Sequence, residues 1–220
     1  MASSAYSAKP KLSVGELLEF VVRVVPLLST QLTISVIRAT ILCFRRRLPL
    51  KYYIWCAFVR TLFWGLNGRQ LQFAIPTVLD SYKGYIKAKR AEASRSKDAV
   101  AASYLREDVE HLEQGAALAW VGDRNKAQKF VLFLHGGGFV IPCQPGHLEW
   151  CYQVYVAGGA GVDTAVAVLF YTLAPAARYP GPLRQAAEAH DWILLESTFH
   201  DVGENTLPMR ECFGRVVGRG

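Results

Sequence analysis

The hydrophobic pattern divides the chain into two halves. In residues 16–44 almost every position is apolar apart from one stripe of polar and charged side chains, which is typical of a long helix. Residues 50–65 form a second apolar segment, and residues 78–90 have the spacing of a basic amphipathic helix. Pro26 is expected to kink or divide the first helix. The first half is therefore predicted to be helical.

Short apolar runs replace these long segments after a small, mixed-charge stretch at 91–103, which we interpret as a linker. Runs of strand length and of helical length then alternate, with turn residues between them. The predicted strands are 108–112, 116–121, 129–134 and 163–171, and the predicted helices are 148–157 and 183–195. This order predicts an α/β protein whose sheet has a parallel element.

The first apolar segment leaves three interpretations open. Its longest charge-free window, 24–37, has 14 residues and contains several Ser and Thr, whereas a membrane-spanning helix needs about 20 predominantly apolar residues. The segment is a transmembrane span, an interfacial or substrate-covering helix, or a core helix. Aromatic residues crowd segment 50–65 beside Arg45-Arg46-Arg47, which suits a lipid head-group interface or simple packing over a core.

Composition and charge narrow the class of partner. A hydrophobic content of 51% excludes disorder of the whole chain. The net charge of +7 is uneven, because residues 1–97 carry +12 and residues 98–220 carry −5. A basic, apolar leading half without a nucleic-acid-binding motif favours an anionic membrane surface and no nucleic acid.

The cysteine content suggests a cellular location, and the change in hydrophobic pattern along the chain suggests a division into parts. Five cysteines without close pairing give no disulfide framework, which fits a reducing compartment. We expect a membrane-associated protein, at the endoplasmic reticulum facing the cytosol, with the cytoplasm as the alternative. The expected parts are a disordered tail (1–15), a helical lid or membrane-associating region (16–97), a partial α/β domain (98–196) and an irregular tail (197–220).

Two motifs carry the candidate chemistry. An apolar strand ends in His135-Gly136-Gly137-Gly138-Phe139, and Tyr171-Thr172-Leu173-Ala174-Pro175 follows about 35 residues later. Glycines permit positive φ and let free N–H groups point into a cleft, which is the chemistry of an oxyanion hole. Together the motifs resemble the hormone-sensitive-lipase-like branch of the α/β-hydrolases. The basic apolar leader is most similar to fungal members of the steryl acetyl hydrolase and related esterase type.

This resemblance implies the N-terminal half of an α/β-hydrolase sheet with a helical lid, and a carboxylic-ester hydrolase acting on lipophilic esters. It makes Gly137 and Gly138 the oxyanion-hole donors and His135 a structural residue. Gly136, Phe139 and the segment from Tyr171 to Pro175 would support the loop, and no cofactor or metal is implied. The sequence departs from the family at Phe170, Ala176 and Ala177, which stand where Asp, Glu and His are usual.

A nucleophile is the missing part of this site. Such hydrolases need a serine in a Gly-x-Ser-x-Gly elbow, followed by an acid and a histidine, and the sequence has no such elbow. Ser197 is the only serine after the glycines, and His200 and Asp201 lie too close to it in sequence to form a triad in series. We therefore expect a chain that stops, or changes reading, before the nucleophile and is inactive as it stands.

Two alternatives to a protein descended from ester hydrolases remain. The chain is a membrane-associated protein that binds an apolar ligand without chemistry, or a truncated gene product without independent function, whose strand 130–134 has a bare edge. Cys143, His147 and Cys151 have the spacing of zinc ligands, but Pro145 interrupts the helix and no fourth ligand follows, so no metal is expected. The pair His190 and Asp191 is expected at the surface.

Overall fold

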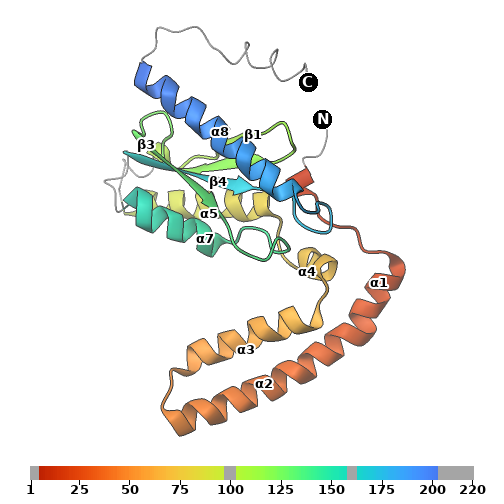
Figure 1. The fold of residues 1–220 in the computed structure, drawn as a ribbon. Coiled ribbons are helices and arrows are strands. Elements are labelled where there is room, and N and C mark those ends of the chain that lie inside the picture. Colours follow the sequence, from red (N-terminus) through yellow and green to blue (C-terminus); the bar gives the residue numbers. More distant parts are fainter. Residues whose placement is uncertain (1–4, 97–102, 158–162, 203–220) are drawn as a thin grey trace.

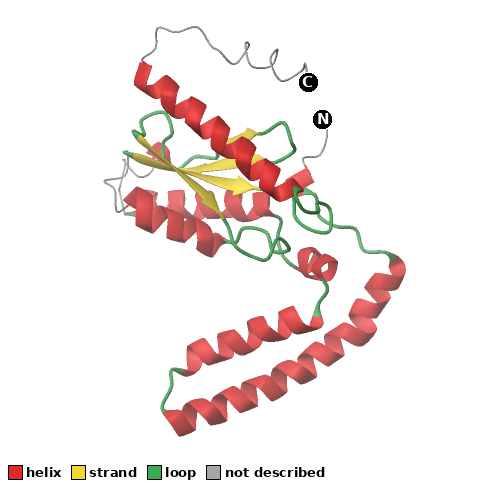
Figure 2. Cartoon of the chain, in the orientation of Figure 1, coloured by secondary structure: helices red, strands yellow, loops and turns green. Residues whose placement is uncertain are grey.

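The computed structural model describes residues 5–96, 103–157 and 163–202 of the chain. These residues form an α/β body and a helical hairpin that projects away from it (Figures 1 and 2). The strands are β1 (Val109–His111), β2 (Ala117–Val121), β3 (Lys129–Leu134) and β4 (Thr164–Phe170). The helices and helical turns are η1 (Ala5–Ser7), α1 (Val14–Glu19), η2 (Phe20–Val24), α2 (Val25–Arg46), α3 (Leu50–Gly65), α4 (Gly68–Ala74), α5 (Val78–Arg95), α7 (Pro145–Cys151), η3 (Tyr152–Ala157) and α8 (Gly181–Val202).

The sheet has the order β1-β2-β4-β3. β2 pairs antiparallel with β1 and β4, whereas β3 and β4 are parallel, so the expected parallel element is present. The register places Phe133 opposite Val168. In the part of the chain that the structure describes, β3 pairs only with β4 and its second edge is open. Its four inner residues are half-buried, whereas all but the first residue of β4 are buried.

Both faces of the sheet are covered, which explains why β4 reads as a continuous apolar run. Val166, Val168 and Phe170 share one hydrophobic cluster with α5, α7 and η3. Ala167 and Leu169 belong to a second cluster with α8. Figure 1 shows α8 on one side of the sheet and α5 and α7 on the other.

The helical hairpin consists of α2 and α3, which lie side by side and antiparallel (Figure 1). α1, η2 and α2 follow one another without a break, and the π-helical turn η2 ends at Val24, two residues before Pro26 in the first turn of α2. Arg47 ends α2 in a left-handed conformation, with φ of 51°. Gly65 lies against the Leu28 side chain, which would have to move to admit a Cβ. Gly65 thus lets α3 approach α2 closely at the open end of the hairpin.

Tyr82 ties α5 to the sheet. Its side chain is fully buried, and its hydroxyl donates to the Trp120 carbonyl (2.7 Å) and accepts from the Asp108 N–H (3.1 Å). Burial raises the pKa of Tyr82 far above its ordinary value. The helix therefore belongs to the α/β body, although the sequence grouped it with the leading region 16–97.

Three predicted boundaries were wrong. Tyr6, in the expected disordered tail, is 5% exposed and packs its ring against Phe170. The expected linker 91–103 begins as helix, because α5 continues to Arg95. α8 continues to Val202, so the first part of the expected irregular tail is helical, and residues 203–220 lie outside the described residues. Local composition failed for Tyr6 and for the end of α5, where Ala93 is buried, because tertiary packing outweighs the weak preference of small polar residues for loops.

Candidate functional site

The glycine loop begins where β3 ends. Gly137 has φ of +123° and Gly138 φ of +60°, and Phe139 also has a positive φ of 60°. A Cβ at position 137 would lie 2.8 Å from the Ile141 carbonyl oxygen, whereas one at Gly136 would have nothing within 4 Å. Backbone conformation and space therefore both require glycine at 137.

The loop is closed by its own backbone. The N–H groups of Val140 and Ile141 donate to the Gly137 carbonyl at 3.1 and 3.0 Å. Among the residues that the structure describes, the N–H groups of Gly137 and Gly138 have no such hydrogen bond. The turn therefore leaves these two N–H groups available to donate to a bound anion, as an anion-binding loop requires.

His135 is held against its own loop. Its Nδ1 lies 2.8 Å from the Gly136 carbonyl oxygen, which can only accept, so Nδ1 carries the proton. Its ring stacks on Tyr171 with the centroids 4.4 Å apart, and the Tyr171 hydroxyl donates to the His135 carbonyl at 2.8 Å. Burial lowers the pKa of His135 to about 4 and raises that of Tyr171 to about 12. Both side chains are therefore neutral near pH 7.

The two sequence motifs meet in space. The N–H of Ala174, which precedes Pro175, donates to the Phe139 carbonyl at 2.8 Å, and the Phe139 and Tyr171 rings are in contact. Phe170, directly before the second motif, is fully buried in the core. The second motif therefore contacts the glycine loop through a backbone hydrogen bond and an aromatic ring contact, and no carboxylate at position 170 takes part.

Gln72 is a site residue that the sequence analysis missed. From α4 in the leading region, its Nε2 donates to the carbonyls of Val140 and Ala174, each at 2.7 Å. One side-chain amide thus joins the glycine loop to the second motif. Gln72 is 68 and 102 residues away from its partners in sequence, and no local pattern distinguishes it from other glutamines.

Gln185 on α8 also supports the second motif. Its Nε2 donates to the Gln114 carbonyl and to the Thr172 hydroxyl, and its Oε1 accepts from the Thr172 N–H. All three distances lie between 2.8 and 2.9 Å. α8 therefore fixes the start of the segment that contacts the glycine loop.

The other candidate residues lie apart from this loop or in structural roles. Ser197 is on α8, and its hydroxyl donates to the Leu194 carbonyl at 2.8 Å. Cys143 and Cys151 are buried, and burial raises the pKa of each thiol to about 12. Over the described ranges no cluster of three His, Cys, Asp or Glu side chains is arranged to hold a metal ion. His147 instead accepts from the Gln144 N–H at the start of α7.

Comparison with known proteins identifies the fold of the α/β body. Residues 131–207, about a third of the chain, match a family model described as alpha/beta hydrolase fold. The described strands and helices agree with it, so the predicted α/β-hydrolase fold is confirmed. A search of curated proteins found no match.

Several solved structures are similar to part of the chain. An esterase from the bacterial hormone-sensitive lipase family is 27% identical over 54% of this chain and 42% of its own, with a TM-score of 0.31. The Francisella virulence factor BioJ is 24% identical over 53% and 36%, with a TM-score of 0.34. The FE-lacking apo form of ESTFA is 22% identical over 42% and 30%, with a TM-score of 0.33. The chain spans less than half of each of these structures, and at such TM-scores they carry no argument about its residues.

Proposed function

We propose that the chain carries the oxyanion-hole half of a carboxylic-ester hydrolase for lipophilic esters, with the N–H groups of Gly137 and Gly138 as the donors. The observation that carries this proposal is a glycine loop with unused N–H groups directly after a parallel strand. Such donors stabilise the negative oxygen of a tetrahedral intermediate, and losing one raises the barrier by about 3 kcal/mol. His135, Tyr171 and Gln72 hold the loop in shape and do not take part in proton transfer.

Binding of a carboxylate tests this role of the loop without requiring turnover. In protein labelled with ¹⁵N-glycine, octanoate, the carboxylate product of a lipophilic ester, is expected to shift the amide signals of Gly137 and Gly138. Gly115, in a turn outside the site, is the internal control and is expected not to shift. Shifts that are absent at both loop glycines, or equal at Gly115, would contradict the assignment.

The chain is proposed to be inactive by itself. Ser197 is the only serine after the loop, and its hydroxyl is bonded to the backbone of α8. We expect no turnover of p-nitrophenyl butyrate and no labelling by a fluorophosphonate probe. Labelling that disappears in Ser197→Ala would show that Ser197 is a nucleophile, and labelling at any other residue would equally refute inactivity.

A second candidate function is a membrane-associated protein that binds an apolar ligand without chemistry. The projecting hairpin, with large apolar side chains exposed along both helices, favours it. One helix, Val14–Arg46, is long and apolar enough to cross a membrane, which on its own is weak evidence. Full-length protein is expected to float with vesicles that contain phosphatidylserine, and failure to float would remove this candidate.

The remaining alternative is a gene product without independent function. It predicts that the purified chain associates through the open edge of β3 and lacks a cooperative unfolding transition. A monomer in size-exclusion chromatography with light scattering, together with a single sharp transition by circular dichroism, would reject it.

A further inference from the structure

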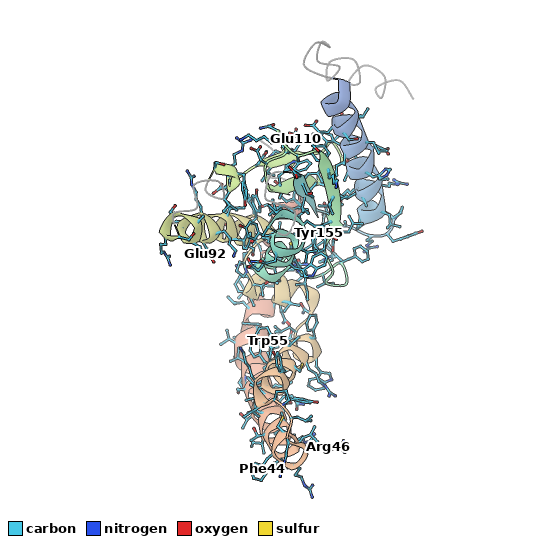
Figure 3. The ribbon with its side chains drawn as sticks, turned by 90° about the vertical axis from the view of Figure 1, so that its left-hand side faces the viewer. Phe44, Arg46, Trp55, Glu92, Glu110 and Tyr155 are labelled. Atoms are coloured by element: carbon cyan, nitrogen blue, oxygen red, sulfur yellow. The ribbon has the colours of Figure 1, made fainter. Side chains whose placement is uncertain are left out.

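The helical hairpin exposes more apolar surface than a water-soluble surface normally does. Only 6% of the most apolar window of the helix Val14–Arg46 is buried. Phe44, near the turn of the hairpin, is 89% exposed, and Trp55 on α3 is 63% exposed. Figure 3 shows both side chains on the part of the molecule that extends away from the α/β body. Exposed apolar surface of this extent is typical of an interaction site.

Four of the hydroxyl groups on α2 are satisfied within the helix. Ser29, Thr30, Thr33 and Thr40 are all exposed, and each donates to a carbonyl three or four residues earlier at 2.8–3.0 Å. A hydroxyl bonded in this way does not need water, so it can enter an apolar medium at low cost. These residues, which interrupt the apolar pattern of the sequence, are therefore compatible with lipid.

Cations occupy two places on the hairpin. Arg45, Arg46, Arg47 and Lys51 lie at its turn, and Figure 3 shows Arg46 at the far end. Arg38 and Arg60 line a groove of about 400 Å³ between α2 and α3. The polar residues Gln31, Ser35 and Tyr53 also line the groove. Arginine binds phosphate groups through paired N–H donors.

Length and charge decide how the hairpin can meet a bilayer. α3 has 16 residues, about 24 Å, whereas the hydrocarbon core is about 30 Å thick. If the hairpin inserted turn-first, the four cations at its turn would not reach the head groups of the far leaflet. Arg38 and Arg60 would also enter the hydrocarbon core, which is unfavourable. A hairpin lying in the plane of the membrane keeps all six cations at the level of the head groups.

We propose that the α2–α3 hairpin lies flat in the head-group layer of an anionic bilayer, with Arg38 and Arg60 bound to lipid phosphates in the groove between the helices. Exposed apolar side chains that do not line the groove, such as Ile37, Phe44 and Trp55, enter the acyl boundary. This inference rests on the membrane association proposed above and specifies its geometry and lipid contacts.

Depth measurement tests the orientation. Cysteines introduced one at a time as Thr33→Cys and Phe44→Cys, in a chain whose Cys56 and Cys212 are replaced by Ser, carry an NBD label, and the remaining Cys43, Cys143 and Cys151 are buried. The two labelled positions lie on the same face of α2, about 16 Å apart along the helix axis. On vesicles of 30% phosphatidylserine and 70% phosphatidylcholine, quenching by lipids with doxyl groups at different depths should place both labels at equal depth. A depth difference above about 10 Å would overturn the flat orientation.

Charge variants test the groove. The double variant Arg38→Gln/Arg60→Gln should bind the same vesicles 10- to 30-fold more weakly, because each lost cation near an anionic surface is worth about a factor of five. Lys87→Gln/Arg90→Gln on α5 removes the same charge from the α/β body and should have at most a threefold effect. Equal losses in the two variants would overturn the groove assignment. Wild-type protein that floats but fails either test contradicts the geometry alone, whereas protein that does not float contradicts membrane association itself.

Discussion

Gln72 offers the sharpest test of how the leading region supports the glycine loop. Its Nε2 has two N–H donors and makes two hydrogen bonds of 2.7 Å, to the carbonyls of Val140 and Ala174. Gln72→Ala removes both and leaves two partly buried carbonyls without these donors. At about 1 kcal/mol net for each bond, the expected loss is about 2 kcal/mol. For a chain of this length, that lowers the melting temperature by roughly 4–8 °C.

Gln72→Glu separates hydrogen bonding from side-chain shape. The substitution preserves size but places an acceptor-only carboxylate beside two carbonyl oxygens at neutral pH. The pKa of this carboxyl in the folded protein is therefore raised above its unfolded value of about 4.3. Its protonated form stabilises the fold at low pH, and that stability is lost as the pH rises through the raised pKa. Gln72→Glu should thus be less stable than Gln72→Ala at pH 7, with the gap narrowing near pH 4.

Thermal unfolding by circular dichroism and hydrogen exchange of the loop measure these effects. The amides of Val140 and Ile141, bonded to the Gly137 carbonyl, should exchange faster in both variants. Gln153→Ala is the matched control, because Gln153 is exposed and bonds only to Glu149, four residues earlier. Equal stability of Gln72→Ala and Gln153→Ala, or a more stable Gln72→Glu at pH 7, would refute the reasoning.

Three further substitutions test the loop and the core. Gly137→Ala should cost more than about 2 kcal/mol through backbone strain and steric overlap, against less than 1 kcal/mol for Gly136→Ala, measured by urea unfolding. His135, whose pKa falls to about 4 in the fold, takes up its proton first in the unfolded chain. Stability should therefore decline by about 3 kcal/mol between pH 6.5 and pH 4. A thermal scan of His135→Asn should show a shallower decline, and identical profiles would contradict this. Tyr82→Phe should lose about 1–3 kcal/mol and exposed Tyr179→Phe almost nothing, since only the first hydroxyl is buried.

The sequence predicts strands well where burial is two-sided. β4 is recognisable because every position after Thr164 is buried between two covered surfaces, which leaves only apolar residues in that run. The glycine loop was recognised because position 137 excludes every side chain, a constraint that is visible in the sequence itself. Prediction from local sequence succeeds at these places because the fold restricts which residue types each single position can hold.

Contacts between distant residues could not be predicted in this way. The hydrogen bonds of Gln72 and the burial of Tyr6 depend on how the leading region folds back onto the sheet. The end of α8 was missed because Ser197 and its neighbours are tolerated in helices, and a hydroxyl bond to Leu194 satisfies the serine there. The contacts of Gln72 and Tyr6 follow from tertiary arrangement and leave no periodic trace in the sequence.

The open edge of β3 gives the chain a concentration-dependent fate. The strand has six residues with Lys129 as the only charge, and in the described part of the sheet it pairs with β4 alone. Joining two such edges is a bimolecular event, so its rate rises with the square of protein concentration, whereas folding of a single chain is first order. Dilute solutions therefore favour the isolated fold, and concentrated ones favour sheets continued from one molecule into the next.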